Sequence, residues 1–225
     1  MSAPCPIEQQ RLNLQATLDG HKTQAERNRL GQFATPSPLA FDILSYAKTN
    51  IPPRNKIRFL DPAIGTGAFY SALLNVFPKN RVQQALGYEI DPHYCKPAAK
   101  LWKETGLCLK LGDFTTAEPS PRHNLIICNP PYVRHHHLEN GNKLRLQMRT
   151  QQASSMRVSG LAGLYCHFLG LSQAWMDENA VAGWLIPSEF MDVNYGQAIK
   201  RYLLDRVTLM PVSYTHLTLP TNREV

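Results

Sequence analysis

Short apolar runs alternate along most of this chain with segments whose apolar residues recur at helical spacing. Apolar runs typical of buried strands lie at residues 57–60, 85–90, 107–111, 125–128, 181–186 and 207–210. Helical patterns lie between them, at residues 68–76, 92–103, 161–176 and 191–204. Strands and helices that alternate in this way are typical of an α/β domain with parallel strands. We therefore predict an α/β fold with a mostly parallel, doubly wound sheet.

The segment before the first strand has a different pattern. Residues 12–30 are mostly polar and predict a helical arm. Ser37 and Pro38 are typical of an N-cap and a first helical residue, so they predict a helix over residues 39–47. The chain of 225 residues is long enough for one large domain. We place that domain at residues 31–211, after an N-terminal arm of residues 1–30.

Composition excludes several classes of protein. The hydrophobic fraction of 43% and the charged fraction of 18% are ordinary for a soluble globular chain. No stretch approaches the roughly 18 apolar residues that a membrane span needs, and the N-terminus lacks the charged and then apolar pattern of a signal peptide. The five cysteines are odd in number and scattered, so we expect a reduced, cytoplasmic protein with no membrane partner.

The formal net charge of +7 favours an acidic partner, and nucleic acid is the usual one. Five basic residues lie between Arg134 and Arg157, against a single acidic residue, Glu139. A stretch of this kind can equally be a solvated loop. Charge alone leaves both interpretations open.

Acidic residues and glycines follow the first predicted strand. Asp61 ends that strand, and the turn after it contains Gly65 and Gly67, which allow a ligand to approach the backbone closely. The turn lacks the third glycine of a dinucleotide fingerprint, because position 70 is Tyr70, and it lacks the ending of a nucleotide P-loop. A nucleoside without phosphates fits this pattern, with Asp61 placed to receive an ammonium group.

Two further carboxylates end the next two predicted strands. Glu89 ends the second strand, where it could accept hydrogen bonds from both hydroxyls of a ribose. Asp113 ends the third, where it could accept from an adenine amino group while Phe114 covers the ring. One carboxylate at a strand end is commonly only a helix cap. Three in succession favour a ligand crevice at the carboxyl edge of the sheet.

The tetrapeptide Asn129-Pro130-Pro131-Tyr132 follows the fourth predicted strand. Its prolines make a stiff turn whose carbonyls can only accept hydrogen bonds. The side chain of Asn129 adds a second acceptor, and Tyr132 adds an aromatic face. Two acceptors beside a stacking surface would hold a planar amino group, such as the exocyclic nitrogen of a base. The alternative is a proline-rich turn that merely ends a strand.

Five segments with these features occur in a fixed order, namely Gln32–Pro36, Asp61–Phe69, Gly87–Asp91, Gly112–Phe114 and Asn129–Tyr132. In this order they resemble the adenine-N6 DNA methyltransferases of the gamma class, which occur in type II and fused type IIG restriction–modification enzymes. Ile186–Phe190 is also family-like, and the match covers roughly residues 25–210. The resemblance implies a Rossmann-like methyltransferase fold that is incomplete here at its last strands.

The resemblance also implies an activity, a cofactor and a site. The expected activity is transfer of a methyl group from S-adenosylmethionine to N6 of a flipped adenine in double-stranded DNA. The implied catalytic residues are Asn129, Pro130 and Tyr132. The implied cofactor contacts are Phe33, Thr35, Pro36, Asp61, Ala63, Gly65, Gly67, Glu89, Asp113 and Phe114. We expect DNA contacts from Arg134, His135, Lys143, Arg145 and Arg149.

The chain also departs from that family. Members carry a further strand hairpin with a second aromatic residue and then a target-recognition domain, and we find neither here, nor a nuclease region. Residues 212–225 do not continue the pattern and resemble translated adapter read-through, so we expect a non-native or disordered tail and a chain cut near Pro211. A restriction endonuclease or a target-recognition module would then complete the system.

Other functions remain open from the residues alone. Glutamine-N5 methyltransferases of release factors use the same turn, although they begin with a helical substrate domain and lack a segment like Gln32–Pro36. Methylation of an RNA base is a second alternative, and a non-catalytic module that binds cofactor or DNA is a third. Three adjacent histidines, His135–His137, cannot readily converge on one ion, and no zinc spacing completes them, so we predict no metal.

Overall fold

The computed structural model of the protein describes residues 6–119, 122–133 and 140–210. These residues form a five-stranded parallel sheet with the strand order β3-β2-β1-β4-β5. The strands are β1 (Ile57–Asp61), β2 (Val82–Glu89), β3 (Leu107–Leu111), β4 (His123–Cys128) and β5 (Met176–Trp184). Because every pair is parallel, all carboxyl ends of the strands lie at one edge of the sheet.

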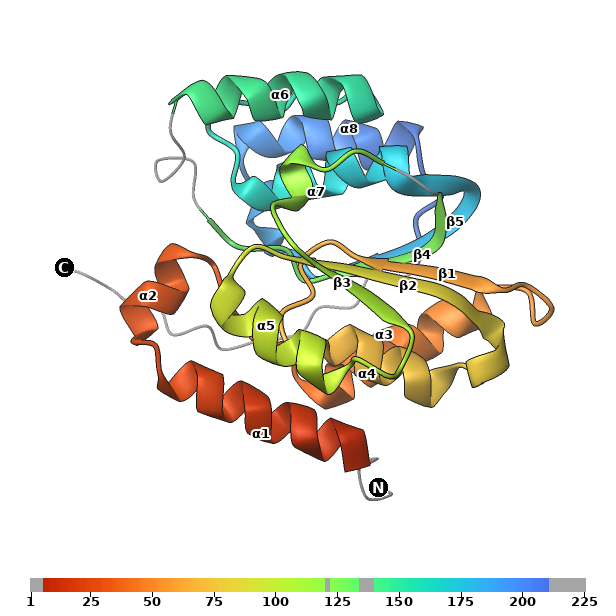
Figure 1. Cartoon of the computed structure of the whole chain (residues 1–225). Coiled ribbons are helices and arrows are strands. Elements are labelled where there is room, and N and C mark those ends of the chain that lie inside the picture. Colours follow the sequence, from red (N-terminus) through yellow and green to blue (C-terminus); the bar gives the residue numbers. More distant parts are fainter. Residues whose placement is uncertain (1–5, 120–121, 134–139, 211–225) are drawn as a thin grey trace.

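Helices cover both faces of the sheet (Figure 1). The α-helices are α1 (Pro6–Gly20), α2 (Gln24–Arg29), α3 (Ser37–Thr49), α4 (Ala68–Val76), α5 (Pro92–Leu101), α6 (Asn140–Ser154), α7 (Leu164–Ser172) and α8 (Gln197–Asp205). The short 3₁₀ helices are η1 (Lys79–Arg81), η2 (Phe114–Thr116), η4 (Gln173–Trp175), η5 (Ser188–Met191) and η6 (Asn194–Gly196).

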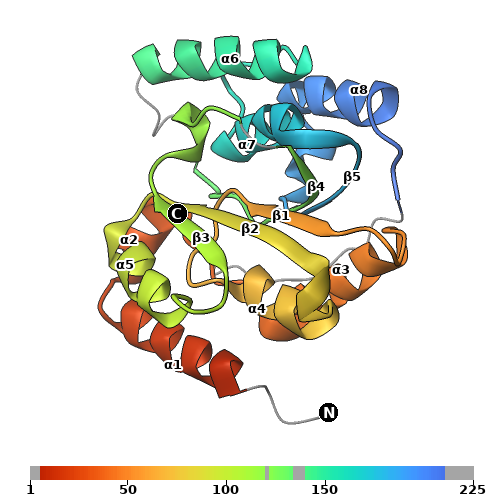
Figure 2. The same cartoon turned by 45° about the vertical axis from the view of Figure 1, so that its right-hand side comes forward.

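The chain crosses from one face to the other near its middle. Helices α3, α4 and α5 cover one face, with α1 outside them, whereas α6, α7 and α8 cover the other (Figures 1 and 2). Strand order explains this, since the chain leaves β1 for β2 and β3 on one side and then returns to β4 and β5 on the other. Right-handed crossovers in opposite directions place their helices on opposite faces.

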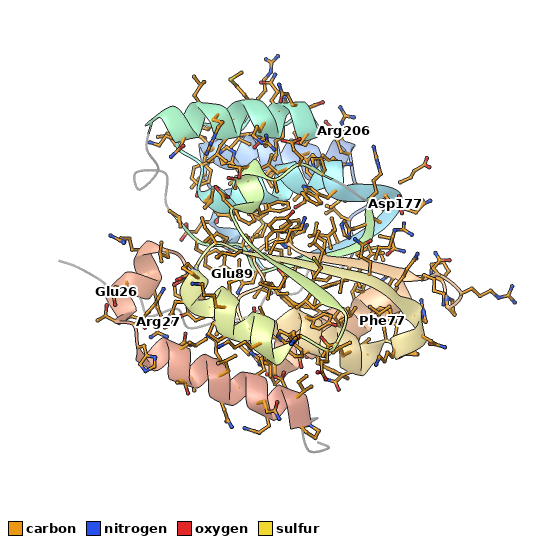
Figure 3. The ribbon with its side chains drawn as sticks, in the orientation of Figure 1. Glu26, Arg27, Phe77, Glu89, Asp177 and Arg206 are labelled. Atoms are coloured by element: carbon orange, nitrogen blue, oxygen red, sulfur yellow. The ribbon has the colours of Figure 1, made fainter. Side chains whose placement is uncertain are left out.

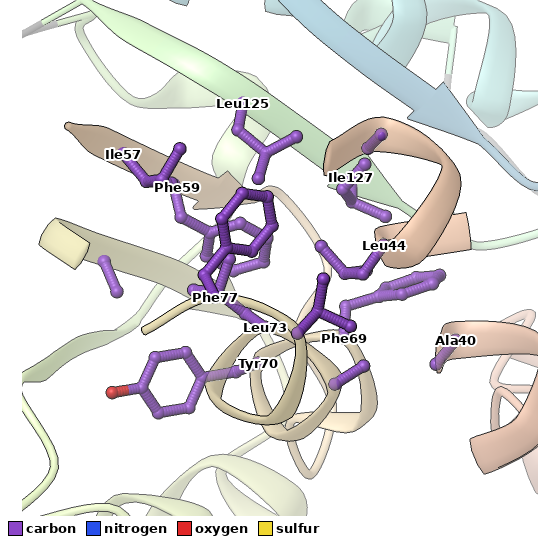
Figure 4. Packing of buried hydrophobic residues seen from close by; sticks show 14 of the residues in the cluster. Ala40, Leu44, Ile57, Phe59, Phe69, Tyr70, Leu73, Phe77, Leu125 and Ile127 are labelled. Atoms are coloured by element: carbon purple, nitrogen blue, oxygen red, sulfur yellow. The ribbon is translucent and has the colours of Figure 1, made fainter. Parts of the chain in front are cut away.

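Apolar side chains of β1 and β4 form the core between the sheet and α4. Phe59 and Leu125 are fully buried and pack against Leu73 of α4 and Phe77, the residue that follows α4 (Figure 4). Burial of one such side chain contributes about 1.5–3 kcal/mol. Continuous apolar strands of this kind are typical of a parallel sheet that is covered on both faces.

The predicted α/β class and parallel sheet are confirmed, and the first five strand predictions match β1 to β5. The strand predicted at residues 207–210 is wrong, because the structure assigns no strand there. Leu209 is 50% exposed and Met210 42% exposed, and no described strand pairs with this segment. An apolar run becomes a strand only when it has a partner for its backbone hydrogen bonds.

Several predicted helix bounds are also wrong. The basic stretch contains α6, because Leu146 and Thr150 lie one turn apart on a buried helix face that the many polar residues concealed. Helix α7 ends at Ser172, so β5 begins well before residue 181. Pro36 is the N-cap of α3 rather than Ser37, whose hydroxyl bonds Glu8. No helix in the described part of the chain is both long and apolar enough to cross a membrane.

Candidate active site

The carboxyl ends of β1, β2 and β4 bring most of the predicted site residues together. Asp61 is the last residue of β1, Glu89 the last of β2, and Asn129 follows β4 directly. Glu89 lies at the end of the sheet near α2, whereas Asp177 lies at the opposite end (Figure 3). Strand register keeps this edge aligned, since Asp61 pairs with Gly87 and Leu60 with Ile126.

The turn between β1 and α4 is shaped by two glycines with left-handed backbone. Gly65 has φ of 56° and Gly67 has φ of 95°. A Cβ at Gly67 would lie 2.6 Å from Nε1 of Trp102, so any side chain there would clash. A Cβ at Gly65 would meet nothing within 4 Å, so this position leaves open space above the turn. The turn therefore presents bare backbone to a ligand.

Asp61 is a buried carboxyl group without a cationic partner among the described residues. It is 1% exposed and accepts one hydrogen bond, from the backbone nitrogen of Ala63 at 3.1 Å. Burial raises its pKa to about 8, and the charge of Glu89 adds to this effect. A ligand cation at this position would stabilise the charged form of the carboxyl group and offset the cost of its burial.

Glu89 braces the same turn from β2. Its Oε2 accepts from the backbone nitrogen of Gly65 at 3.0 Å, and its Oε1 accepts from that of Asp91 at 2.8 Å. Burial raises the pKa of Glu89 despite these bonds. Each carboxylate oxygen has a second lone pair, so both can still accept from a ligand hydroxyl.

Asp113 and Phe114 each have an internal role. Oδ1 of Asp113 accepts from the backbone nitrogen of Thr115 at 2.8 Å and from its hydroxyl at 2.7 Å, which caps η2. The ring of Phe114 is 2% exposed and packs 5.4 Å from the rings of Phe168 and Trp175. Contact of either residue with a cofactor stays a prediction.

Asn129 has an amide whose orientation is set by a distant segment. Its Nδ2 donates to the carbonyl of Phe33 at 3.1 Å and to Oγ1 of Thr35 at 3.2 Å. A carbonyl cannot donate, so the nitrogen must face Phe33. Oδ1 therefore faces away from this segment, and in the structure it accepts from the hydroxyl of Tyr132 at 2.7 Å.

Tyr132 is held on several sides. Its hydroxyl also lies 3.0 Å from the carbonyl oxygen of Leu185, after β5. Its ring stacks on Phe33 with centroids 5.7 Å apart and an interplanar angle of 29°. Gly31, with φ of 62°, approaches so closely that a Cβ there would lie 2.3 Å from the backbone nitrogen of Tyr132. Burial raises the pKa of Tyr132, so its hydroxyl stays protonated.

A small cavity of about 50 Å³ lies where these segments meet. Its described lining includes six of the predicted site residues, namely Phe33, Thr35, Asp61, Ala63, Gly65 and Asn129. The other predicted cofactor and catalytic residues are not in that lining: Pro36, Gly67, Glu89, Asp113, Phe114, Pro130 and Tyr132. The lining also contains Ala34, Ile64, Thr66, Ala68 and Phe69, which lie in the singled-out segments Gln32–Pro36 and Asp61–Phe69 but were not predicted as contacts, and Gln15, which lies outside those segments.

Gln15 is the least expected member of that set, because it lies on α1. Glu8, Arg11 and Leu18 are buried on the same helix, and together with Gln15 they recur at steps of three and four residues. This spacing marks a helix face. The face was missed because its members are mostly polar, whereas a buried face is usually recognised from apolar residues.

A larger groove of about 870 Å³ lies at the opposite end of the sheet. Some of its polar groups bond one another: Arg58 forms an ion pair with Asp177, and Asn124 bonds the backbone of Arg58 and of Lys56. None of the predicted site residues lines it. The smaller cavity therefore remains the candidate site, despite its size.

The predicted DNA contacts fall partly on α6. Arg145 is exposed there, and Lys143 is half-buried. Arg149 instead bonds Glu118 at 3.1 Å and the carbonyl of Ala117 at 2.9 Å. Arg134 and His135 lie outside the described residues, as do His136 and His137. In the ranges that the structure covers, no group of three or more His, Cys, Asp or Glu is placed to hold a metal ion.

A family model described as Eco57I restriction-modification methylase matches residues 94–215, which is more than half of the chain. The chain belongs to this family. Family membership confirms the resemblance to type II restriction–modification methylases, and S-adenosylmethionine is the expected cofactor of such a methylase.

Curated relatives agree with this assignment. The chain is 28% identical over 184 residues to the type II methyltransferase M.AccI of Acinetobacter calcoaceticus, covering 81% of this chain and 32% of the relative. It is 29% identical over 187 residues to M.XamI of Xanthomonas campestris pv. amaranthicola, covering 80% and 34%. The chain thus spans about a third of the length of these relatives.

Solved structures share the fold. The structure of a DrdV–DNA complex has a TM-score of 0.69 at 18% identity, over 89% of this chain and 25% of that one. A protein of Listeria monocytogenes described as a class I S-adenosylmethionine-dependent methyltransferase has a TM-score of 0.65 at 17% identity, over 88% and 59%. The predicted Rossmann-like methyltransferase fold is therefore confirmed.

Proposed function

We propose that this chain is the catalytic part of a DNA methyltransferase that methylates the N6 amino group of adenine. The orientation of the Asn129 amide carries the proposal. Its nitrogen donates to two acceptors in the segment Gln32–Pro36, so Oδ1 is turned away from that segment and toward the hydroxyl of Tyr132. An oxygen held in this way suits a planar amine, which offers two N–H donors.

The chemistry needs such acceptors because the lone pair of an aromatic amine is delocalised into its ring. Asn129 Oδ1 and the carbonyl of Pro130 would accept the two N–H groups and draw the nitrogen toward tetrahedral geometry. Both acceptors are amide oxygens, so neither removes a proton before transfer. The methylated nitrogen would then lose its extra proton to solvent, and S-adenosylhomocysteine would be the product left by the donor. Holding two reactants in attack geometry can lower a barrier by up to roughly 7–11 kcal/mol.

The hydroxyl of Tyr132 fits this arrangement. It bonds Asn129 Oδ1 in the free protein, and it has a second acceptor in the carbonyl of Leu185. When the target amine arrives, the hydroxyl can turn to Leu185 and release Oδ1 without losing a hydrogen bond. One face of the ring stacks on Phe33, so a base would have to stack on the other face, an interaction worth about 1–3 kcal/mol.

The residues around Asp61 fit S-adenosylmethionine. The open space over Gly65 suits the amino acid end of this cofactor, and so does the buried carboxyl of Asp61, which has no cationic partner among the described residues. Glu89, beside them, is placed for the ribose hydroxyls. A cavity of about 50 Å³ is far smaller than the roughly 300–1,000 Å³ of a small-molecule pocket. It would therefore hold only one end of the cofactor. When bound, S-adenosylmethionine supplies an activated methyl group.

Double-stranded DNA is the proposed substrate. Its bases are stacked inside the duplex, so the target must be flipped out, which costs a few kcal/mol. Lys143 and Arg145 of α6 are the described basic residues that we assign to the DNA backbone. The relatives that this chain matches are named as type II methyltransferases, which supports DNA rather than a release factor or RNA.

The test is transfer of a tritiated methyl group from S-adenosylmethionine to DNA, RNA and release-factor substrates in parallel. We expect label in DNA alone, and chromatography of the digested DNA should find it in N6-methyladenine. Asn129→Ala should abolish transfer while calorimetry shows nearly unchanged cofactor affinity, because Asn129 acts on the target amine. Asn28→Ala, an asparagine on α2 whose side chain bonds Gln24 in the described part of the chain, is the matched control.

Four outcomes would overturn the proposal. Label in protein or RNA would identify another substrate, and N4-methylcytosine would identify another base. Cofactor binding by the wild-type chain with no transfer to any substrate would support a binding module. An equal loss of cofactor affinity in Asn129→Ala would remove Asn129 from the target side of the site.

A further inference from the structure

Helix α1 contributes a polar side chain to the candidate cofactor cavity. Gln15 lines that cavity together with Thr35, Asp61 and Thr66. The sequence between Gln15 and Asp61 includes all of α2 and α3, so the fold brings a distant arm back to the β1–α4 turn. Helix α1 lies outside α4 and α5 in both views (Figures 1 and 2).

A buried ion pair anchors this part of α1. Arg11 is 1% exposed and donates to both carboxylate oxygens of Glu8, at 2.8 and 2.6 Å. The same guanidinium donates to the hydroxyls of Ser37 at 2.9 Å and Thr66 at 3.3 Å. A buried charge is tolerated only when its donors are satisfied, so this pair fixes α1 against α3 and the β1–α4 turn.

The pair also orients Gln15 through Thr66. Because Arg11 donates to Oγ1 of Thr66, the hydroxyl proton of Thr66 is directed elsewhere, and it goes to Oε1 of Gln15 at 2.5 Å. Nε2 of Gln15 donates to Oδ1 of Asp19 at 2.9 Å. An amide nitrogen has two N–H donors, so the described contacts leave one for a ligand.

Charge decides which part of a ligand can use that donor. The amino acid end of S-adenosylmethionine has an ammonium and a carboxylate on the same carbon. Asp61 attracts the ammonium and repels the carboxylate, so the carboxylate must turn to the other side of the cavity. Gln15 is the side-chain amide among the described lining residues that still has an unused N–H, since the amide nitrogen of Asn129 is engaged.

We propose that Gln15 binds the carboxylate of the cofactor's amino acid end. The inference rests on the proposed function, because it assumes that S-adenosylmethionine is the ligand. It assigns to α1 a direct part in cofactor selection. Arg11 acts as a positioning residue, which holds Thr66 and thereby the amide of Gln15.

The test compares two ligands that share a nucleoside and differ in the amino acid end. Isothermal calorimetry would measure S-adenosylmethionine and 5′-methylthioadenosine, which lacks the ammonium and the carboxylate. Gln15→Leu should weaken the binding of S-adenosylmethionine by about ten- to a hundredfold, the range expected for loss of a hydrogen bond to a charged group. Binding of methylthioadenosine should stay within about twofold of the wild type, because the lost donor faces the missing carboxylate. Gln9→Leu, on the exposed side of α1, should change neither affinity.

A second variant keeps the contact with Thr66. Gln15→Glu retains an acceptor for the Thr66 hydroxyl but replaces the donor by a negative charge. It should therefore weaken the binding of S-adenosylmethionine at least as much as Gln15→Leu does. Unchanged affinity for S-adenosylmethionine in the folded variants would overturn the inference. Equal weakening of both ligands would also overturn it, since Gln15 would then only shape the turn. If the wild type binds neither ligand, the proposed function fails as well.

Discussion

Asp61 should couple cofactor binding to the release of a proton. Burial, with a smaller effect from the charge of Glu89, raises the pKa of Asp61 from 3.8 to about 8. Below pH 8 the carboxyl group in the free protein is therefore mostly protonated. If Asp61 receives the ammonium of the cofactor, its pKa falls on binding. One proton then leaves the protein for each cofactor bound.

The size of this effect follows from linkage. Between the bound and the free pKa, affinity changes about tenfold for each pH unit, which corresponds to about 1.4 kcal/mol. The protonated carboxyl predominates in the free protein at low pH, so affinity falls as the pH falls below 8. From pH 7 to pH 5 we expect the dissociation constant to rise about a hundredfold. An α-amino group titrates at about pH 8, so measurements stay below pH 7.

Calorimetry with S-adenosylmethionine in two buffers of different ionisation enthalpy counts the protons directly. The wild type should release about one proton at pH 6, and Asp61→Asn should release none and bind with nearly pH-independent affinity. Asp42→Asn, an exposed residue on α3, is the matched control and should behave as the wild type. Binding of S-adenosylmethionine without proton release would refute the assignment of Asp61. If the affinity of Asp61→Asn depends on pH as steeply as that of the wild type, Glu89 rather than Asp61 would be the group that releases the proton.

Three further outcomes can be checked. Burial lowers the pKa of His123 from 6.5 to about 4, so this residue contributes stability above pH 6.5 that is lost as the pH falls toward 4. From pH 7 to pH 5, the free energy of unfolding measured in urea should therefore fall by about 2 kcal/mol less in His123→Phe than in the wild type. Gly31→Ala forces a Cβ against the nitrogen of Tyr132 and should lower the free energy of unfolding by at least about 2 kcal/mol with loss of transfer, whereas Gly20→Ala, whose Cβ meets nothing, should keep transfer. Arg145→Gln should reduce the slope of log K for DNA binding against log salt concentration by about the amount that one phosphate contact contributes. An unchanged slope would show that Arg145 of α6 does not contact the DNA backbone.

The parallel sheet could be predicted because each strand contains a short apolar run. A strand buried on both faces needs no alternation of apolar and polar residues, so an uninterrupted apolar run such as Leu125–Cys128 predicts a buried strand. Helix α6 could not be predicted in the same way, because a few buried residues on a polar helix give a weak period. The segment at residues 207–210 shows the converse error, since an apolar run carries no information on whether a neighbouring strand will pair with it.

The site divides along the same line. Residues at strand ends, such as Asp61 and Glu89, could be predicted because parallel strands align their carboxyl ends at one edge. No comparable signal marks Gln15, which reaches the cavity through a buried polar face of α1 and contacts with Thr66. Such contacts depend on how α1 docks, and local periodicity does not report docking.

The orientation of Asn129 is a property that no local pattern contains. The sequence shows an amide with two donors and two acceptors at the end of a strand. Which side faces Tyr132 depends on Phe33, which is 96 positions away in the chain and whose carbonyl can only accept. Thr35 lines the cofactor cavity and bonds the same amide. A change in Gln32–Pro36 should therefore disturb cofactor binding and target-amine recognition together.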